Sequence, residues 1–203
     1  MFDGAEIHEA TLTLLAIAQQ GATYEIFAPD MEQHHVINHL TGQEMPEKRN
    51  VLVESARIAR GKIKPLSEFS PSGFDALILP GGFGAAKNLS TVAFHGPDAS
   101  VNKDVEKVVK AMHAAGKPIG ALCIAPAVIA KILGDVEVTI GQDPGTAQAI
   151  EKMGGKHVKT THGEVTVDRK NKIFTTPCYM LDATIVQIYE GARNVVNEIM
   201  LNV

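Results

Sequence analysis

The sequence predicts an α/β three-layer sandwich built on a mostly parallel sheet. Strand-like and helix-like segments alternate along the 203 residues, an order that places helices on both faces of a parallel sheet. The segment FDALILPGG, residues 74–82, is a near-continuous apolar run ending in glycines, as a strand buried on both faces is. A second apolar strand, KPIGALC at residues 117–123, runs directly into a helix-like segment.

The first half of the chain supplies two helices and two strands. Residues 5–21 have helical spacing and stop at Gly21, a helix-ending signal. A strand follows at 23–29, then the apolar strand at 74–82. Residues 101–116 read as an amphipathic helix with Asn102 as the N-cap. Between them, residues 34–66 have weak periodicity, and we expect an inserted excursion, part helix and part loop, beside the sheet.

The second half continues the alternation. After the strand at 117–123, Pro126 lies in the first turn of a helix at 124–134. Two strand-like runs within residues 164–177 predict a hairpin whose turn is formed by Arg169 to Asn171. The remaining predicted elements are strands at 136–140 and 157–160, a helix at 145–155 and a long final helix at 182–201. Without a repeat or a low-complexity linker, residues 1–203 are expected to form one domain.

Composition excludes several classes of protein. Apolar residues make up 45% of the chain, which is too many for disorder to be expected. A net charge of −4 gives no electrostatic reason to expect nucleic acid or an anionic membrane as a partner. No apolar run approaches the ~20 residues that a membrane-spanning helix needs. Only two cysteines are present, which indicates a reducing compartment rather than a disulfide framework.

Cys123 lies where the second apolar strand meets the next helix. Small residues flank it at Ala121 and Ala125, as the tight turn of a nucleophile elbow requires. A thiol at a helix N-terminus also faces unpaired N–H groups that favour the thiolate. Cys123 is therefore either a nucleophile or a buried structural cysteine, and this stretch alone does not decide between them.

Gly81, Gly82 and Gly84 follow the first apolar strand. Glycines there let the backbone approach a ligand and aim N–H groups at a developing oxyanion, although a simple tight turn has the same composition. The Walker pattern GxxxxGK[ST] is absent. A dinucleotide fingerprint starting at Gly82 fails because Lys87 stands where its third glycine belongs.

The sequence gives weaker signals for the acidic and basic side chains that could assist the thiol. Glu6 and Glu9 are three residues apart on the first helix, where they form either a proton-transferring site or a solvated acidic turn. Among the histidines that could serve Cys–His catalysis, His8 is nearest to this helix, while His113, His157 and His162 have no distinctive spacing. His35 and His39 are four apart but lack the HExxH context of a zinc site, so no metal is expected.

Several segments together resemble one family. DGAEIHEA, NHLTGQ, RNVLVESARIARGKI, LILPGGFGAAKNLS, GKPIGALCIAPA and NKIFTTPCYM are similar to the ElbB-type proteins, which were named for enhancing lycopene (isoprenoid) biosynthesis. These are a branch of the ThiJ/PfpI superfamily with a class I glutamine-amidotransferase-like fold. The resemblance covers nearly the whole chain, and PGGFGAAKNLS and CIAPA are specific when they occur together.

The resemblance implies a flavodoxin-like sandwich with Cys123 on the elbow. It places the acid that bonds the thiol at Glu9, with Glu6 and His8 in support. It implies oxyanion donors at the Gly82 and Ile124 amides, with Gly81 and Asn88 in the same substrate-binding set. Superfamily members have glyoxalase, deglycase and protease roles, and ElbB-type members show weak glyoxalase-type activity at most. A homodimer without cofactor is expected, cytoplasmic in a bacterium and mitochondrial in a eukaryote.

This sequence departs from the family pattern in two ways. Gly141 occupies the position where some active members carry a histidine, and Ile124 replaces the histidine of the protease-like branch, which argues against proteolysis. The family also begins with a central strand and an SGCG-like loop before DG, and neither stands before Asp3. Its loss would cost more than the ~5–15 kcal/mol of stability that a domain has. We therefore expect an incomplete sequence or another element in that place.

Three functions follow from these residues. The first is a cofactor-free lyase that converts small 2-oxoaldehydes to 2-hydroxy acids through a Cys123 hemithioacetal, with Glu9 moving the proton. The second is a non-catalytic stress or regulatory protein linked to isoprenoid biosynthesis that keeps Cys123 as an oxidation sensor. The third, glutamine amidotransferase, is weakest because no histidine is placed to complete a triad.

Overall fold

The computed structural model describes all residues 1–203 and has the predicted order of elements. The helices are α1 (Ile7–Gln19), α2 (Val51–Ile58), α3 (Phe83–Lys87), α4 (Val92–His95), α5 (Lys103–Ala114), α6 (Ala125–Leu133), α7 (Pro144–Lys152) and α8 (Ile185–Met200). The strands are β1 (Phe27–Ala28), β2 (Lys64–Pro65), β3 (Leu77–Leu79), β4 (Ile119–Leu122), β5 (Glu137–Val138), β6 (Lys156–His157), β7 (Thr166–Asp168) and β8 (Ile173–Thr176).

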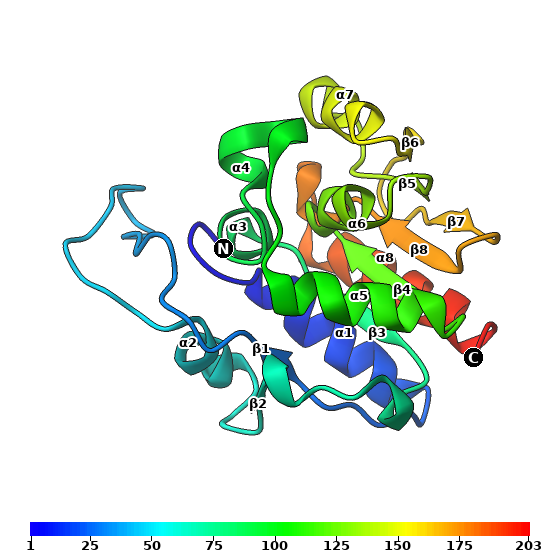
Figure 1. Ribbon diagram of the computed structural model, residues 1–203, viewed down its shortest axis with the longest axis horizontal. Helices are drawn as coiled ribbons and strands as arrows, with labels where there is room; N and C mark the ends of the chain where they lie inside the picture. The colour runs from blue at the N-terminus through cyan, green and yellow to red at the C-terminus, as the bar shows by residue number, and fades with distance from the viewer.

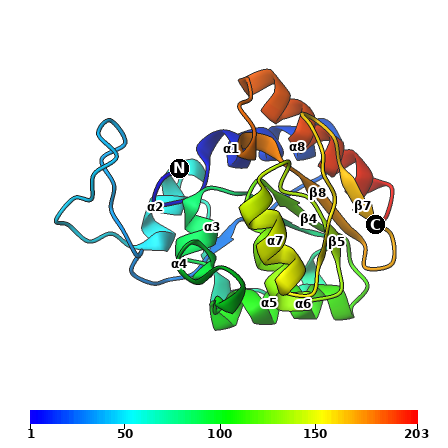
Figure 2. The same cartoon turned by 90° about the horizontal axis from the view of Figure 1, so that it is seen from above.

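The central sheet carries the fold. Its order is β3-β4-β8-β7, with β3, β4 and β8 parallel and β7 antiparallel to β8. Helices α1 and α8 cover one face, and α5 and α6 cover the other (Figure 2). This arrangement confirms the predicted α/β sandwich and the flavodoxin-like layering. None of the eight helices has the length and hydropathy that crossing a membrane requires.

Local signals in the sequence explain where the helices begin. Asn102 caps α5, accepting from the amides of Asp104 and Val105, and Pro126 lies in the first turn of α6. Apolar side chains of α5 and α6 pack on β4 in the largest buried cluster, which includes Val109, Met112 and Ile129. The layers are therefore held by the apolar faces that the sequence pattern predicted.

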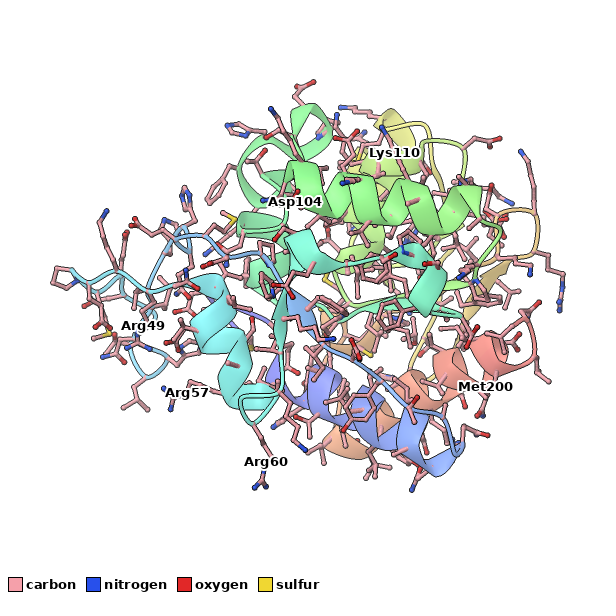
Figure 3. The ribbon with its side chains drawn as sticks, turned by 60° about the horizontal axis from the view of Figure 1, so that its bottom comes forward. Arg49, Arg57, Arg60, Asp104, Lys110 and Met200 are labelled. Carbon is pink, nitrogen blue, oxygen red and sulfur yellow. The ribbon has the colours of Figure 1, made fainter.

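The segment 34–66 has more structure than its weak periodicity indicates. It contains α2, capped by Asn50, and β2, which pairs in parallel with β1. The chain between β1 and α2 extends from the rest of the molecule as a long arm (Figure 1). Arg57 and Arg60 of the arginine-rich stretch point outward beside α2 (Figure 3), and Arg57 lies 4.0 Å from Glu54.

A cavity of about 840 Å³ separates β1 from β3. Both strands line it together with apolar residues of α1, and the two strands belong to different sheets. Each strand is hydrogen-bonded on its far side only, to β2 and to β4 respectively. The cavity thus lies between two facing strand edges, where the sequence led us to expect a missing central strand.

We predict rapid hydrogen exchange at the open edge of β3. The Leu77 amide donates to the Pro118 carbonyl, so the next amide, Ile78, points toward β1 because N–H groups alternate sides along a strand. Ala121 on β4 has strands on both sides. Exchange measured by NMR should be faster at Ile78 than at Ala121 by at least about tenfold. Equal protection at both amides would show that the β3 edge is paired in solution.

Candidate active site

Cys123 lies on a sharp strand-to-helix turn between β4 and α6, which has the shape of a nucleophile elbow. Cys123 directly follows β4 and has φ 60°, a left-handed conformation that is strained for any residue other than glycine. Its amide donates to the Thr176 carbonyl at the end of β8, at 2.9 Å, which fixes the turn. Flanking Ala121 and Ala125 are both fully buried, so small side chains are needed for the turn to fit. The sulfur is held at the carboxyl end of the parallel strands, where ligands bind in such sheets.

Glu9 brings a carboxyl group to this turn from α1. Its side chain is fully buried, with 0% of its surface exposed, and its Oε2 lies beside the Cys123 sulfur, since a Cβ built on Gly81 would lie 2.7 Å from the oxygen and 2.9 Å from the sulfur. The carboxylate also accepts the Gly81 amide at 2.9 Å and the Tyr179 amide at 3.3 Å. Three elements from distant parts of the chain therefore fix the carboxyl group beside the thiol.

Burial and mutual charge shift both groups toward their protonated forms. Burial, and then the charge of Glu6, raise the pKa of Glu9 from 4.5 to about 7. Burial, followed by the charge of Glu9, raises the pKa of Cys123 well above its ordinary value. The backbone N–H groups of Gly82 and Ile124 act in the opposite direction and lower the pKa of the Cys123 thiol. The pair therefore retains a proton near neutral pH, and the carboxyl group can exchange it with the sulfur.

Glu6 has a structural role one turn before Glu9. It is the N-cap of α1, and its Oε2 accepts the Glu9 amide at 2.7 Å. Its own amide donates to the Gly81 carbonyl at 3.0 Å, so the start of α1 is tied to the glycine loop. Both acids are buried, which rules out the solvated acidic turn that the sequence left open. Glu6 therefore positions Glu9 and supplies the negative charge that raises its pKa.

The glycine loop touches both reacting groups. A Cβ built on Gly81 would lie 2.4 Å from the Cys123 Cβ and 2.7 Å from Glu9 Oε2. Gly82 has φ 89°, and a Cβ there would lie 2.3 Å from the Glu6 amide nitrogen. Only glycine fits at these positions, because the backbone itself forms the wall of the site. Because the backbone of Gly81 and Gly82 packs directly against these groups, the Gly82 amide at the end of β3 can face the Cys123 sulfur.

No histidine completes a triad with Cys123. His8 is exposed, and its Nδ1 lies 2.7 Å from the Tyr179 hydroxyl rather than near the sulfur. His113 contacts Asn171 at the opposite end of the sheet, and His162 contacts the Asp182 carbonyl. Gly141 packs against Pro177 and Leu181, so the position where family members carry a histidine is near the site but bears no side chain.

Asn88, which is expected to bind substrate, holds backbone groups of two other segments in this structure. Its Oδ1 accepts the His34 amide at 2.8 Å, and its Nδ2 donates to the Asp3 carbonyl at 2.9 Å. Both ends of the buried amide are therefore engaged in holding the N-terminal residues and the arm against α3. His35 and His39 lie outside helices and have separate partners, Glu44 and Asp3.

Tyr179 and Thr176 were missed by the analysis of the sequence. Both lie in the segment TTPCYM, yet their contacts with Glu9 and Cys123 are made by backbone groups. Backbone contacts leave no residue-type signal, so only the register of β4 on β8, with Leu122 opposite Thr176, could have indicated them. Neither Cys123 nor Glu9 lines the cavity beside β1, but Gly81 of the glycine loop does, so this loop lies between the site and the cavity.

We predict that Gly81→Ala disrupts the site. The new Cβ would overlap Cys123 and Glu9, and overpacking of this kind costs roughly 1–3 kcal/mol or more. The thermal midpoint should fall by at least about 3 °C, and Cys123 alkylation by iodoacetamide should change rate. Gly73→Ala is the matched control, because nothing lies within 4 Å of the Cβ that it would gain. Equal midpoints for the two variants would contradict the proposed packing.

We also predict that ionisation of Glu9 lowers the free energy of unfolding as the pH rises. A carboxyl group with a raised pKa binds its proton more tightly when folded, so stability falls as pH rises from 4.5 to about 7 and then levels off. The free energy of unfolding should fall by about 3 kcal/mol in all over this pH range. Urea unfolding between pH 5 and 8 should show this fall in the wild type relative to Glu9→Gln, which cannot titrate. Parallel stability curves would mean that the Glu9 pKa is ordinary.

Comparisons with known proteins agree with this geometry. The model of the DJ-1/PfpI family matches residues 1–175. The human protein "Glutamine amidotransferase-like class 1 domain-containing protein 3, mitochondrial" is 50% identical over 210 residues, covering 98% of this chain and 78% of that protein. A crystal structure of an isoprenoid biosynthesis protein with an amidotransferase-like domain from Ehrlichia chaffeensis is 35% identical, with TM-score 0.93 over 99% of this chain and 93% of that one.

A more distant structure shares the fold alone. Glyoxalase III from Candida albicans superposes with TM-score 0.63 at 15% identity, covering 98% of this chain and 88% of that one. The family match extends over most of the chain, including the glycine loop, the elbow and most of β8. With its class I glutamine-amidotransferase-like fold and its cysteine elbow, the chain belongs to the DJ-1/PfpI family.

Proposed function

We propose that this protein is a cofactor-free glyoxalase-type lyase that converts small 2-oxoaldehydes such as methylglyoxal and glyoxal into 2-hydroxy acids. The observation that carries the proposal is the buried Glu9 carboxyl group beside the Cys123 thiol at the glycine loop. Isomerising a 2-oxoaldehyde requires a nucleophile for the aldehyde and a base that moves one proton between adjacent carbons. The site holds both groups in contact and needs no redox cofactor for this chemistry.

Each step has a group assigned to it. The Cys123 thiol gives its proton to ionised Glu9 as the sulfur adds to the aldehyde carbon, and Glu9 returns that proton to the resulting oxyanion to give a hemithioacetal. Glu9 then removes the proton from that carbon and returns it to the neighbouring carbon. The hydroxyl proton of the hemithioacetal passes to the oxygen on the neighbouring carbon, which leaves a thioester of the 2-hydroxy acid. Water hydrolyses the thioester and regenerates the thiol. Because the Glu9 pKa is about 7, the carboxyl group can both accept and donate the proton near neutral pH.

The oxyanions are assigned to backbone donors. The amides of Gly82 and Ile124 lower the pKa of the Cys123 thiol, as N–H donors near the sulfur do, so an oxygen on the adjacent carbon would lie within their reach. Tyr179 and His8, joined by a 2.7 Å contact at the exposed side of α1, would border the substrate. The missing triad histidine leaves thioester hydrolysis without a dedicated base, and we therefore expect slow turnover.

A second candidate function is regulation or stress sensing without catalysis. The observation that favours it is the same missing histidine, together with a strained, buried cysteine that has a carboxyl partner. We also propose that the chain belongs to the ElbB-type branch, because the Ehrlichia protein is described as an isoprenoid biosynthesis protein. Glutamine amidotransferase activity is the weaker alternative, since glutamine hydrolysis ordinarily uses a Cys–His pair.

The remaining proposals concern the compartment and the assembly. The proposed nucleophile must stay reduced, as it does in a bacterial cytoplasm or in mitochondria, and the human relative is named as mitochondrial. A homodimer is proposed, and the arm between β1 and α2 is the first place to examine because Leu40 is 98% exposed on it. The net charge of −4 gives no reason to include nucleic acid among the partners.

We predict lactate formation from methylglyoxal that depends on Cys123 and Glu9. Cys123→Ala should reduce turnover to background, and Glu9→Gln should lower kcat at least about a hundredfold because the proton carrier is lost. D- and L-lactate, each measured enzymatically, report both the rate and the stereochemistry. Glu106→Gln, which removes an exposed carboxylate on α5, is the matched control and should retain full activity.

The controls separate catalysis from folding. Circular dichroism and the thermal midpoint should confirm that each variant is folded. Full activity in Glu9→Gln would eliminate the proposed proton transfer. Absence of turnover in the wild type, with Cys123 the faster thiol to oxidise, would favour the sensing function over the lyase.

A further inference from the structure

The second cysteine lies beside the nucleophile and is not used by the proposed reaction. Strand β8 runs parallel to β4 with Leu122 opposite Thr176, and the Cys123 amide donates to the Thr176 carbonyl. Cys123 therefore lies next to Pro177, and Cys178 is the following residue. The two cysteines are far apart in the sequence, yet they follow the carboxyl ends of two neighbouring parallel strands.

The register brings both cysteines to the same end of the sheet. Cys123 is the first residue after β4 and Cys178 is the second after β8, beyond the paired residues Leu122 and Thr176. Both then belong to one small buried cluster. A disulfide needs roughly 4.4–6.8 Å between α-carbons, a separation that is usual for residues packed in one cluster.

Both sulfurs lie on the same face of the sheet. A Cβ built on Gly81 would lie 2.9 Å from the Cys123 sulfur and 2.7 Å from Glu9 Oε2 of α1, and a Cβ built on Gly191 of α8 would lie 3.5 Å from the Cys178 sulfur. Helices α1 and α8 cover this face together (Figure 2). The cysteines are 7% and 5% exposed and belong to one small apolar cluster with Leu122, Ile188 and Ala192.

The backbone at Cys178 also resembles that at the elbow. Cys178 has φ 43° and Cys123 has φ 60°, and both values are in the left-handed region that residues other than glycine avoid. Burial first, and then the charges of Glu9 and Cys123, raise the pKa of the Cys178 thiol. Both thiols are therefore protonated in the resting site, and they lie in one buried cluster.

We propose that Cys123 and Cys178 form a redox pair in which Cys178 captures oxidised Cys123 as an intramolecular disulfide. A hydroperoxide oxidises the Cys123 thiolate to sulfenic acid, as the peroxide O–O bond breaks and the other oxygen leaves as water or an alcohol. The Cys178 sulfur then displaces the hydroxyl group from the Cys123 sulfur. That hydroxyl leaves as water with the Cys178 proton, and both thiols have been oxidised by one peroxide.

The pair would regulate the site rather than take part in its reaction. A disulfide removes the nucleophile reversibly and protects it from sulfinic acid, which thiols do not reduce. This inference rests on Cys123 being the nucleophile of the proposed function. Its test is independent of turnover, because the bond is detected by mass and not by lactate.

The experiment treats the reduced full-length chain with equimolar hydrogen peroxide and then blocks free thiols with iodoacetamide. The expected product is a monomer that has lost two hydrogen atoms and takes up no label, with a tryptic peptide joining Cys123 to Cys178. Dithiothreitol should restore two labelled thiols. In Cys178→Ala, peroxide should instead add oxygen to Cys123. A wild type in which Cys123 gains oxygen while Cys178 is labelled, or is linked only between chains, would overturn the proposal.

A second measurement avoids the variant, because Cys178 is buried and Cys178→Ala could be unstable. Phenylarsine oxide bridges two thiols only when they are close, so the reduced wild type should bind one arsenical per chain and lose both labelled thiols. Cys123→Ala should lose this binding. An arsenical that blocks neither thiol of the folded wild type would contradict the proximity of the pair. If the disulfide forms but methylglyoxal is not converted, the redox pair stands and the lyase proposal fails.

Discussion

The site depends on one constraint: the carboxyl group of Glu9 is buried away from water and needs hydrogen-bond donors from the protein. Burying Glu9 is unfavourable unless its oxygens find donors, and the donors come from the end of β3 and from the turn after β8. These two segments and the elbow after β4 must therefore meet at one point. The sheet supplies that point because β3, β4 and β8 are parallel neighbours whose carboxyl ends coincide.

The same constraint explains the local strain. The left-handed turn at Cys123 places the sulfur beside Glu9, while Gly81 and Gly82 bring the backbone into contact with both groups. Strain of this kind persists only where surrounding contacts hold it, and here the Thr176 carbonyl and the buried cluster around Leu122 do so. The contacts that hold the strained turn are therefore the same contacts that place the Cys123 sulfur beside Glu9.

The sequence predicted the layers and the residue types of the site, and missed the contacts made by backbone. Alternating apolar segments, the Asn102 cap and the Gly21 stop are local signals, so the elements of the sandwich could be predicted from them. Cys123 and Glu9 carry chemistry in their side chains and could be singled out. Tyr179 acts through its amide, and Asn88 serves as a clamp for the N-terminal residues, and both depend on long-range packing. The weak periodicity of residues 34–66 likewise gave no sign that β2 would pair with β1.

The open edges of β1 and β3 define what would complete the sheet. An unpaired strand edge is a template on which another extended chain can assemble. Here two such edges face one another across a cavity lined mostly by apolar residues, so a strand entering it would gain hydrogen bonds on both sides and apolar contact along its length. One continuous sheet would then run from β2 through β1, β3, β4 and β8 to β7.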